Sequence, residues 1–183
     1  MICGQEHFQL KNCKFRIANT FSDDLELFFK PAVKSNSSLG KGRPKGGLFM
    51  AWKKSIIKKS TRISSENFRI QAAILEFEDC KLLLINTYFP FNSQNVVLSN
   101  DEAAEIQKLL SETHSIKDKY SKSYDTSIVL GDMNYDDNRY TGHTLAVNNF
   151  LENERLCSIW ESHPVDFTFS SGQSFSTISF SGL

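Results

Sequence analysis

The sequence is poor in cysteine, and the cysteines it has are scattered. Cys3, Cys13, Cys80 and Cys157 form no Cys-x-x-Cys pair, and none of them has a histidine at zinc-finger spacing. These spacings argue against a disulfide framework and against a structural zinc site. We therefore expect a protein of an intracellular, reducing compartment.

A targeting segment, a membrane span and an excess of charge are missing as well. Residues 1–7 carry an acid and no long apolar run, which is not the pattern of a signal peptide. No stretch approaches the roughly 18 apolar residues of a membrane span, so we expect a soluble protein with no membrane partner. The 21 Lys plus Arg balance 21 Asp plus Glu. A strongly basic domain, the simplest argument for a nucleic-acid partner, is therefore absent, and any such argument must rest on local charge or on a site.

The chain does contain enough hydrophobic residues for a folded core. They make up 40% of its 183 residues, which excludes a disordered or collagen-like protein. The length predicts a single domain over residues 1–183. Because layered α/β enzymes often run to about 200–250 residues, we expect this domain to be a partial one.

The hydrophobic pattern predicts strands first and then strands alternating with helices. Short apolar runs at residues 1–3, 47–52 and 126–130 have strand length, and residues 68–78 and 81–89 form a predicted hairpin. Ser99 and Glu102 match a capping box before a helix at about 101–119, and a second helix is predicted at 142–154. Residues 34–47 are predicted to be a loop and 166–170 a final strand. This order indicates a mixed-sheet, layered α/β domain.

Two polar residues follow the predicted strand at 126–130. Asp132 comes directly after Gly131, and Asn134 comes two residues later. Side chains at the end of a buried strand are held rigidly and still reach solvent, so Asp132 can act as a general base or a metal ligand and Asn134 can bind a phosphate oxygen. The alternative interpretation is a plain Gly-Asp-x-Asn turn.

Glu6 and Tyr88 are further candidates. Glu6 follows the short strand at residues 1–3, and Mg²⁺ commonly takes one or two protein carboxylates together with water and substrate phosphates. The alternative for Glu6 is a solvated glutamate. Tyr88 ends an apolar strand and precedes Pro90, so its phenol can face a ligand, or else it is a core residue with a satisfied hydroxyl.

Taken in order, these motifs resemble a known family. Gln5-Glu6, Gly46-Gly47-Leu-Phe, Asn86-Thr-Tyr-Phe-Pro90 and Ile128-Val-Leu-Gly-Asp-Met-Asn134 are similar to the endonuclease/exonuclease/phosphatase superfamily. Residues 42–48 and the run from 149 to 168 are similar to the apurinic/apyrimidinic-type endonuclease domain of LINE (non-LTR) retrotransposons. The resemblance covers nearly the whole chain.

The resemblance implies a fold and a set of roles. The fold is a four-layer α/β sandwich of two mixed, largely antiparallel sheets with outer helices, incomplete here at both termini. Glu6 would bind Mg²⁺ or Mn²⁺, Asp132 would activate or orient water, and Asn134 and Tyr88 would contact the scissile phosphate. The implied substrate is DNA, the location is nuclear, and a reverse transcriptase domain would share the parent polypeptide if the element is intact.

The chain also departs from the family pattern. The upstream strand with its catalytic Asn and the closing Ser-Asp-His are both missing, so we expect truncation at both ends. Asn92 stands one position late after the Tyr-x-Pro motif, and Ser179 stands where the family has an Asp. Since losing single members of a cooperative catalytic set costs orders of magnitude in rate, we expect little or no nuclease activity from this chain.

Local charge offers one more candidate contact with DNA. Residues 41–62 hold eight Lys or Arg and no Asp or Glu, and Arg43 and Lys45 lie within the family-like flank. This stretch suits phosphate contact, or it is a set of solvated strand and loop ends. The sequence thus leaves three hypotheses: an impaired DNA endonuclease domain, a noncatalytic nucleic-acid-binding remnant, or another phosphoesterase of the superfamily acting on lipid, inositol phosphate or RNA.

Overall fold

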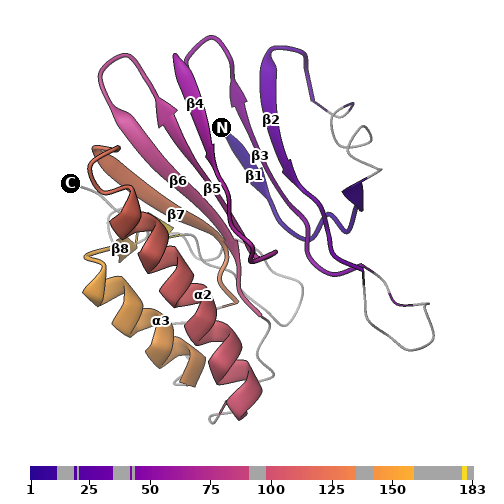
Figure 1. Ribbon diagram of the computed structural model, residues 1–183, viewed down its shortest axis with the longest axis vertical. Coiled ribbons are helices and arrows are strands. Elements are labelled where there is room, and N and C mark those ends of the chain that lie inside the picture. Colours follow the sequence, from indigo (N-terminus) through magenta and orange to yellow (C-terminus); the bar gives the residue numbers. More distant parts are fainter. Residues whose placement is uncertain are drawn as a thin grey trace.

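Two β-sheets pack face to face, and two helices cover the outer face of the larger sheet (Figure 1). The computed structural model describes residues 1–11, 19, 21–34, 42, 44–90, 98–134, 142–158 and 179–180. Within these ranges the order of layers is small sheet, large sheet, helices. The prediction of an α/β sandwich of two largely antiparallel sheets is therefore confirmed, and three of the four predicted layers lie within the described residues. The strand predicted at 166–170 and most of the loop predicted at 34–47 lie outside the described residues.

The smaller sheet has three antiparallel strands in the order β1-β3-β2. They are β1 (Ile2–Gly4), β3 (Leu48–Lys53) and β2 (Leu25–Lys30). Met50 in the central strand is paired with Cys3 on one side and with Phe28 on the other.

The larger sheet has four strands in the order β4-β5-β6-β7. They are β4 (Lys59–Ile63), β5 (Ile70–Glu76), β6 (Lys81–Tyr88) and β7 (Thr126–Asp132). The first three are antiparallel, whereas β7 runs parallel to β6. A parallel neighbour needs a long crossover, which here contains α2 (Asn100–Lys119). The helix α3 (Gly142–Asn153) follows β7, and a short pair, β8 (Cys157–Ser158) and β9 (Ser179–Phe180), completes the described elements.

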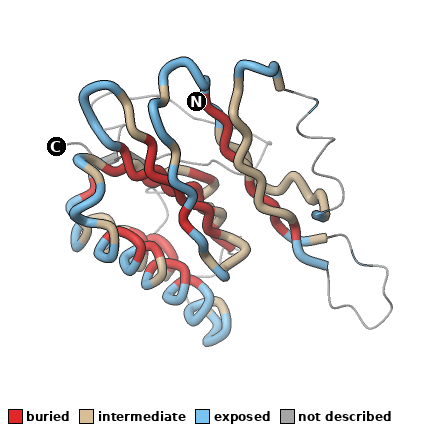
Figure 2. Tube along the Cα trace, turned by 45° about the horizontal axis from the view of Figure 1, so that its top comes forward, coloured by how far each residue is buried: buried red, intermediate tan, exposed pale blue. Residues whose placement is uncertain are grey.

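The large sheet is buried on both faces, as the apolar runs of β5 and β6 predict. Side chains on one face of the sheet, such as Ile74, Leu83 and Ile85, pack against α2 and α3. Side chains on the other face, such as Leu75 and Leu84, pack against Met50 and Trp52 of the small sheet. Figure 2 shows the buried residues along the middle strands and on the inward sides of the helices.

The sequence predicted the elements with strong local patterns; besides the two-residue strands β8 and β9, it missed two strands. The β5–β6 hairpin, both helices and the capping box of Ser99 and Glu102 are confirmed. The missed strands are β2 and β4. The sequence Lys-Ser-Thr-Arg-Ile of β4 has almost no apolar pattern because β4 is a largely exposed edge strand whose pairing with β5 determines its conformation.

Within the part of the chain that is described, no helix is both long and apolar enough to cross a membrane.

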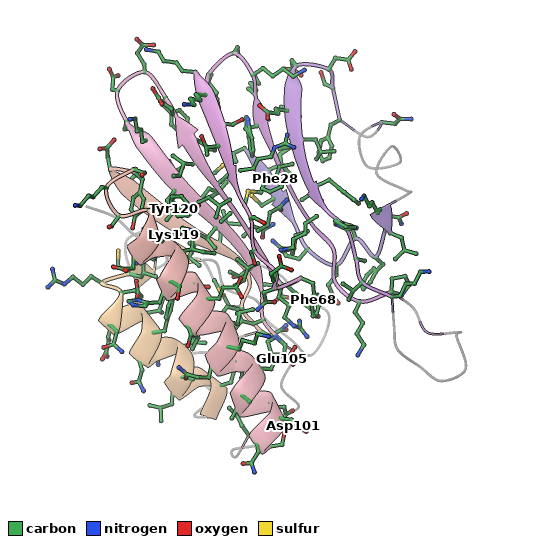
Figure 3. The ribbon with its side chains drawn as sticks, in the orientation of Figure 1. Phe28, Phe68, Asp101, Glu105, Lys119 and Tyr120 are labelled. Carbon is green, nitrogen blue, oxygen red and sulfur yellow. The ribbon has the colours of Figure 1, made fainter. Side chains whose placement is uncertain are left out.

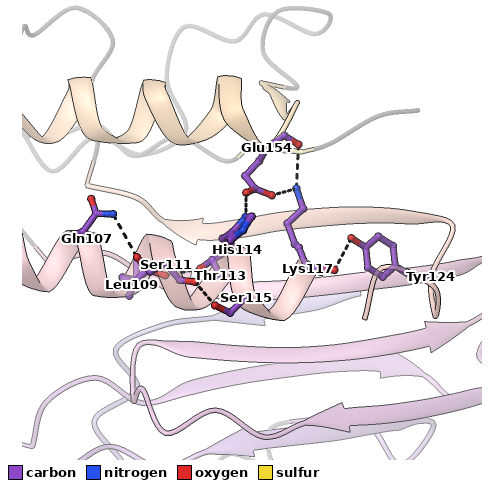
Figure 4. Close-up of polar contacts among 9 residues, drawn as sticks. All are labelled: Gln107, Leu109, Ser111, Thr113, His114, Ser115, Lys117, Tyr124 and Glu154. Atoms are coloured by element: carbon purple, nitrogen blue, oxygen red, sulfur yellow. Dashed lines mark hydrogen bonds and ion pairs between the residues drawn. The ribbon is translucent and has the colours of Figure 1, made fainter. Parts of the chain in front are cut away.

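An ion-pair network fastens the end of α3 to α2 (Figure 4). The Lys117 ammonium is 2.8 Å from one Glu154 carboxylate oxygen and also donates to the Glu154 carbonyl, while His114 contacts the other carboxylate oxygen. Burial by itself would raise the pKa of Glu154. The hydrogen bonds and positive charges of Lys117 and His114 outweigh burial and hold this pKa below its usual value.

Replacing Glu154 with Gln should destabilise the protein in a pH-dependent way. Because the folded-state pKa of Glu154 is depressed, its stabilisation is present above about pH 4.5, its ordinary value, and is lost as the pH falls through the folded-state pKa. We expect Glu154→Gln to cost about 1–2 kcal/mol at pH 7, a Tm lower by roughly 2–8 °C. Thermal unfolding at pH 7 and at pH 3.5 should show this difference shrinking in acid. The exposed neighbour Glu152, changed to Gln, is the control, and an equal effect there would contradict the network.

Gly131, just before the end of β7, lies directly against β6. Its φ is +140°, and a Cβ added there would lie 1.8 Å from the Thr87 carbonyl oxygen. We therefore expect Gly131→Ala to cost at least about 3 kcal/mol, because neither the backbone of β6 nor the strained φ can adjust cheaply. Urea unfolding measures the loss. An unchanged midpoint would show that β6 and β7 separate easily at this point.

Candidate active site

Three strands end, with polar residues at or just after their last positions, at one end of the sandwich. We call this end the site edge. The parallel register of β6 and β7 pairs Tyr88 with Asp132. The end of β1 lies over the same part of β6, where the buried Asn86 side chain donates to the Gly4 carbonyl. This edge therefore collects side chains from positions 5, 6, 88, 132 and 134, which lie far apart in the sequence.

Asn86 joins the two sheets at this edge. Its Nδ2 lies 3.1 Å from the Phe49 carbonyl of β3 and 3.3 Å from the Gly4 carbonyl of β1, and its Oδ1 accepts a hydrogen bond of 2.6 Å from Gln5. Asn86 is fully buried. Since an unpaired buried amide costs about 1–3 kcal/mol, these bonds hold Gln5, and therefore the start of the Glu6 loop, in one place.

Glu6 and Tyr88 contact each other directly. The Glu6 backbone is left-handed, with φ of 52°. The Tyr88 hydroxyl donates a hydrogen bond to the Glu6 carboxylate. Burial, followed by this hydrogen bond and the negative charge of Glu6, raises the pKa of Tyr88 to about 12, and the charge of Asp132 acts in the same direction. Tyr88 is therefore a protonated phenol at neutral pH, able to donate a hydrogen bond.

Asp132 and Asn134 form a tight turn at the end of β7. The Asn134 N–H donates to the Asp132 Oδ1 at 3.1 Å, and the Asn134 side-chain amide donates to the Phe89 carbonyl at 2.8 Å. Asn134 has a left-handed φ of 46°, which asparagine tolerates better than most residues. The turn that the sequence offered as an alternative is thus present, and it presents Asp132 beside Tyr88.

Arg69 lies at this edge as well, although no sequence motif singled it out. Its guanidinium lies 4.8 Å from the centre of the Tyr88 ring and 5.0 Å from that of Phe68, and its Nη1 donates to the Tyr88 carbonyl. Its Nε donates to Glu105 of α2 at 2.8 Å. Phe68 and Glu105, both labelled in Figure 3, mark this corner of the molecule. Arg69 precedes β5 as a single basic residue in no motif, so only the strand pairing reveals its place.

A half-buried lysine, Lys30, supports the loop that carries Arg69. The Lys30 ammonium donates to the carbonyls of Ser65, Asn67 and Ile70 at 2.6–2.8 Å. Burial lowers the pKa of Lys30 to about 8. One side chain of β2 thus binds the small sheet to the turn between β4 and β5.

The remaining candidates fall in different places. Lys45 pairs through its backbone with Val33, just before the segment that enters β3. Arg43 and Asn92 lie outside the described residues. Ser179 belongs to β9, where its backbone pairs with Ser158.

The basic stretch at 41–62 divides between the two ends of the sandwich. Four lysines at positions 53, 54, 58 and 59 lie at the far end, because β3 runs away from the edge that holds Glu6 and β4 starts opposite Glu76. Six residues of strand place Lys53 about 17 Å from Leu48. Lys58 pairs with Glu78 and Arg62 with Glu26. Phosphate contact by this stretch stays a prediction. Of its described basic residues, Lys45 comes just before β3, at the end of that strand nearer the site.

The structure describes three histidines, and the contacts of each one are structural rather than those of a catalytic histidine. His114 belongs to the Glu154 network, and His143 at the start of α3 is 1% exposed and stacks on Phe89. The His7 ring binds backbone carbonyls of β2 and β3. Burial lowers the pKa of both His7 and His143.

The donor set at this edge suits a divalent cation of the Mg²⁺ type. Among the described residues, no group of three or more His, Cys, Asp or Glu side chains could enclose a metal. Mg²⁺ commonly uses only one or two protein carboxylates and fills its octahedron with water and substrate phosphate. Glu6 and Asp132, both close enough to Tyr88 to raise its pKa, provide oxygen ligands of this kind.

Comparison with known proteins was informative only at the level of three-dimensional structure. No family model and no curated protein sequence matches the chain. Among solved structures, the endonuclease domain of TRAS1, a telomere-specific non-LTR retrotransposon, matches with a TM-score of 0.56 and 11% identity, over 99% of this chain and 85% of that one. The 3′ phosphatase NExo from Neisseria, bound to a product DNA hairpin, matches with a TM-score of 0.62 and 14% identity, over 98% and 75%. The catalytic domain of human Nocturnin gives a TM-score of 0.58 and 14% identity, over 98% and 68%.

At sequence identities this low, structural similarity establishes the fold and does not establish the chemistry. The motifs at positions 5–6, 86–90 and 128–134 had predicted the same group of proteins from the sequence, and the comparison confirms that prediction for the architecture. The chain has the fold of the endonuclease/exonuclease/phosphatase superfamily.

Proposed function

We propose that the chain is a Mg²⁺-dependent phosphodiester hydrolase domain of the endonuclease type that acts on DNA, derived from a LINE-type retrotransposon. One observation carries the proposal: Glu6, Tyr88, Asp132 and Asn134, chosen from separate motifs, end at one edge of the sandwich. The retrotransposon endonuclease domain among the structural neighbours supports the LINE origin. A nuclear location and a reverse transcriptase on the same parent polypeptide are part of this proposal.

Each side chain has a task that phosphodiester hydrolysis requires. Bound Mg²⁺ or Mn²⁺, held by Glu6, would supply positive charge next to the phosphate. Asp132 orients or deprotonates the attacking water, and the turn with Asn134 fixes the direction of its carboxylate. Tyr88, kept protonated by its raised pKa, donates to a phosphate oxygen in exchange for its bond to Glu6.

Arg69 supplies the positive charge that holds an anionic substrate at this edge. The positive charge of Arg69 lowers the pKa of Tyr88, whereas the negative charges of Glu6 and Asp132 raise it. Glu105 and the ring of Phe68 hold the guanidinium in place. An arginine fixed beside a phenol and two carboxylates suits contact with a DNA phosphate.

The chain should hydrolyse DNA slowly, because one carboxylate of the family pattern is replaced. Ser179 stands where the family motif has an Asp, and a serine hydroxyl does not supply a negative charge at neutral pH. A noncatalytic nucleic-acid-binding domain is the second candidate. It is favoured by the same substitution, because binding needs Arg69 and the scaffold but not the missing carboxylate.

Nicking of supercoiled plasmid tests the catalytic proposal. With Mg²⁺ we expect slow nicking that falls at least about 100-fold in Asp132→Ala and in Glu6→Gln, and that rises in Ser179→Asp. The control is Asp79→Ala, in the turn between β5 and β6 at the far end of the sheet. Equal rates for wild type and Asp132→Ala would reject the role of Asp132, and DNA binding without any nicking would favour the noncatalytic domain.

The salt dependence of DNA binding tests Arg69. Loss of one phosphate contact should reduce the slope of log K against log salt by about 0.9 for duplex DNA. We therefore expect Arg69→Gln to weaken binding and to lower this slope by about one, measured by fluorescence anisotropy at several salt concentrations. Arg155→Gln is the control, because Arg155 is an exposed arginine just after α3, outside the site and outside the basic stretch at 41–62. The same change of slope in both variants would contradict a specific contact at Arg69.

A further inference from the structure

The segment that carries Glu6 follows an irregular path between β1 and β2. Glu6 and Phe8, which flank His7, both have left-handed backbones, with φ of 52° and 55°. For residues other than glycine each such conformation costs on the order of 1–3 kcal/mol and persists only where the surroundings hold it. The residue that holds this segment therefore also decides where the Glu6 carboxylate lies.

The His7 ring joins the segment to two strands of the small sheet. Its Nε2 lies 3.0 Å from the Lys30 carbonyl of β2 and 3.3 Å from the Leu48 carbonyl of β3. Its Nδ1 accepts a hydrogen bond of 2.9 Å from the Gln9 N–H. Because Nδ1 accepts, the ring proton is on Nε2, so a single neutral tautomer satisfies all three neighbours.

The packing around the ring allows only one position. His7 stacks on Phe29 with a centroid distance of 4.7 Å and an interplanar angle of 18°. On its other side, a Cβ at Gly47 would lie 2.4–2.8 Å from three atoms of the ring. The glycine at 47, whose φ is +96°, thus leaves the space that the imidazole fills.

The backbone on both sides of His7 is attached to the same glycine pair. The His7 N–H donates to the Gly47 carbonyl at 3.4 Å, and the Phe8 N–H donates to the Gly46 carbonyl at 3.1 Å. On the site side, Gln5 is bound to Asn86. Glu6 therefore lies between two fixed points. One is the hydrogen bond from Gln5 to Asn86 between the sheets, and the other is the set of contacts that His7 makes.

We propose that His7 is a positioning residue: its ring fixes the conformation of residues 5–9 and thereby directs the Glu6 carboxylate toward Tyr88. The use of that carboxylate as a cation ligand rests on the proposed function, whereas the fixing of the segment does not. His7 acts through the backbone, and its ring nitrogens are engaged by carbonyls and an amide remote from the chemistry.

Two measurements on the intact chain test this role. Hydrogen exchange of the Phe8 and Gln9 amides, followed by NMR in metal-free buffer, reports the segment itself, and Mn²⁺ binding, followed by EPR, reports the consequence for Glu6. His7→Phe keeps an aromatic ring and removes the hydrogen bonds. We expect it to accelerate exchange of the Gln9 amide at least tenfold and to weaken Mn²⁺ binding about tenfold, as the loss of an outer-shell partner does. His7→Gln, which can still donate to the Lys30 carbonyl, should recover part of both effects.

The control separates positioning from a general loss of stability. Leu75→Val changes a fully buried side chain between the sheets at the far end of β5 and should lower Tm without accelerating exchange at Gln9. Wild-type exchange rates in His7→Phe, or equal acceleration in Leu75→Val, would overturn the role of His7. If wild type binds Mn²⁺ no better than Glu6→Gln, the proposed metal site fails instead, and the exchange rates still decide whether His7 holds the segment.

Discussion

At the candidate site, the position of one sheet relative to the other depends on one buried side chain, Asn86. Its amide binds backbone carbonyls of β1 and β3 and accepts from Gln5, so it connects the large sheet to two strands of the small one. Apolar packing between the sheets is not directional and would tolerate small shifts. The amide is directional, and a shift would leave it unpaired in the interior, which is costly. The place of Glu6 relative to Tyr88 and Asp132 follows from this constraint.

A second buried amide extends the same connection. Gln71 on β5 is the register partner of Asn86, and its Nε2 donates to the Phe28 carbonyl of β2 at 2.8 Å. Together the two amides bind all three strands of the small sheet. Lys30 makes the reverse connection, from β2 to the turn that carries Arg69. These polar links between the sheets lie at the site end; a further one, from Glu26 of β2 to Ser60 and Arg62 of β4, lies toward the other end, and apolar packing fills the interface between them.

The electrostatics of the site come from two carboxylates and one guanidinium around a phenol. Glu6 and Asp132 favour the protonated phenol and Arg69 opposes them, with burial as the largest influence on its pKa. The site therefore places charges of both signs around one phenol. Glu6, Asp132 and Arg69 come from segments far apart in the sequence, so the composition of the chain, with zero net charge, conceals this arrangement.

Local sequence determined the elements whose information is local: the hairpin of β5 and β6, the capped helix α2 and the glycine–aspartate turn after β7. It also selected Glu6, Tyr88, Asp132 and Asn134, since each belongs to a short motif. Tertiary structure alone decided that β2 and β4 are strands, that Arg69 faces Tyr88 and that the lysines at 53–59 lie at the opposite end. The physical reason is that a polar edge strand or a single arginine acquires its role from the backbone that pairs with it, and that partner lies in another strand.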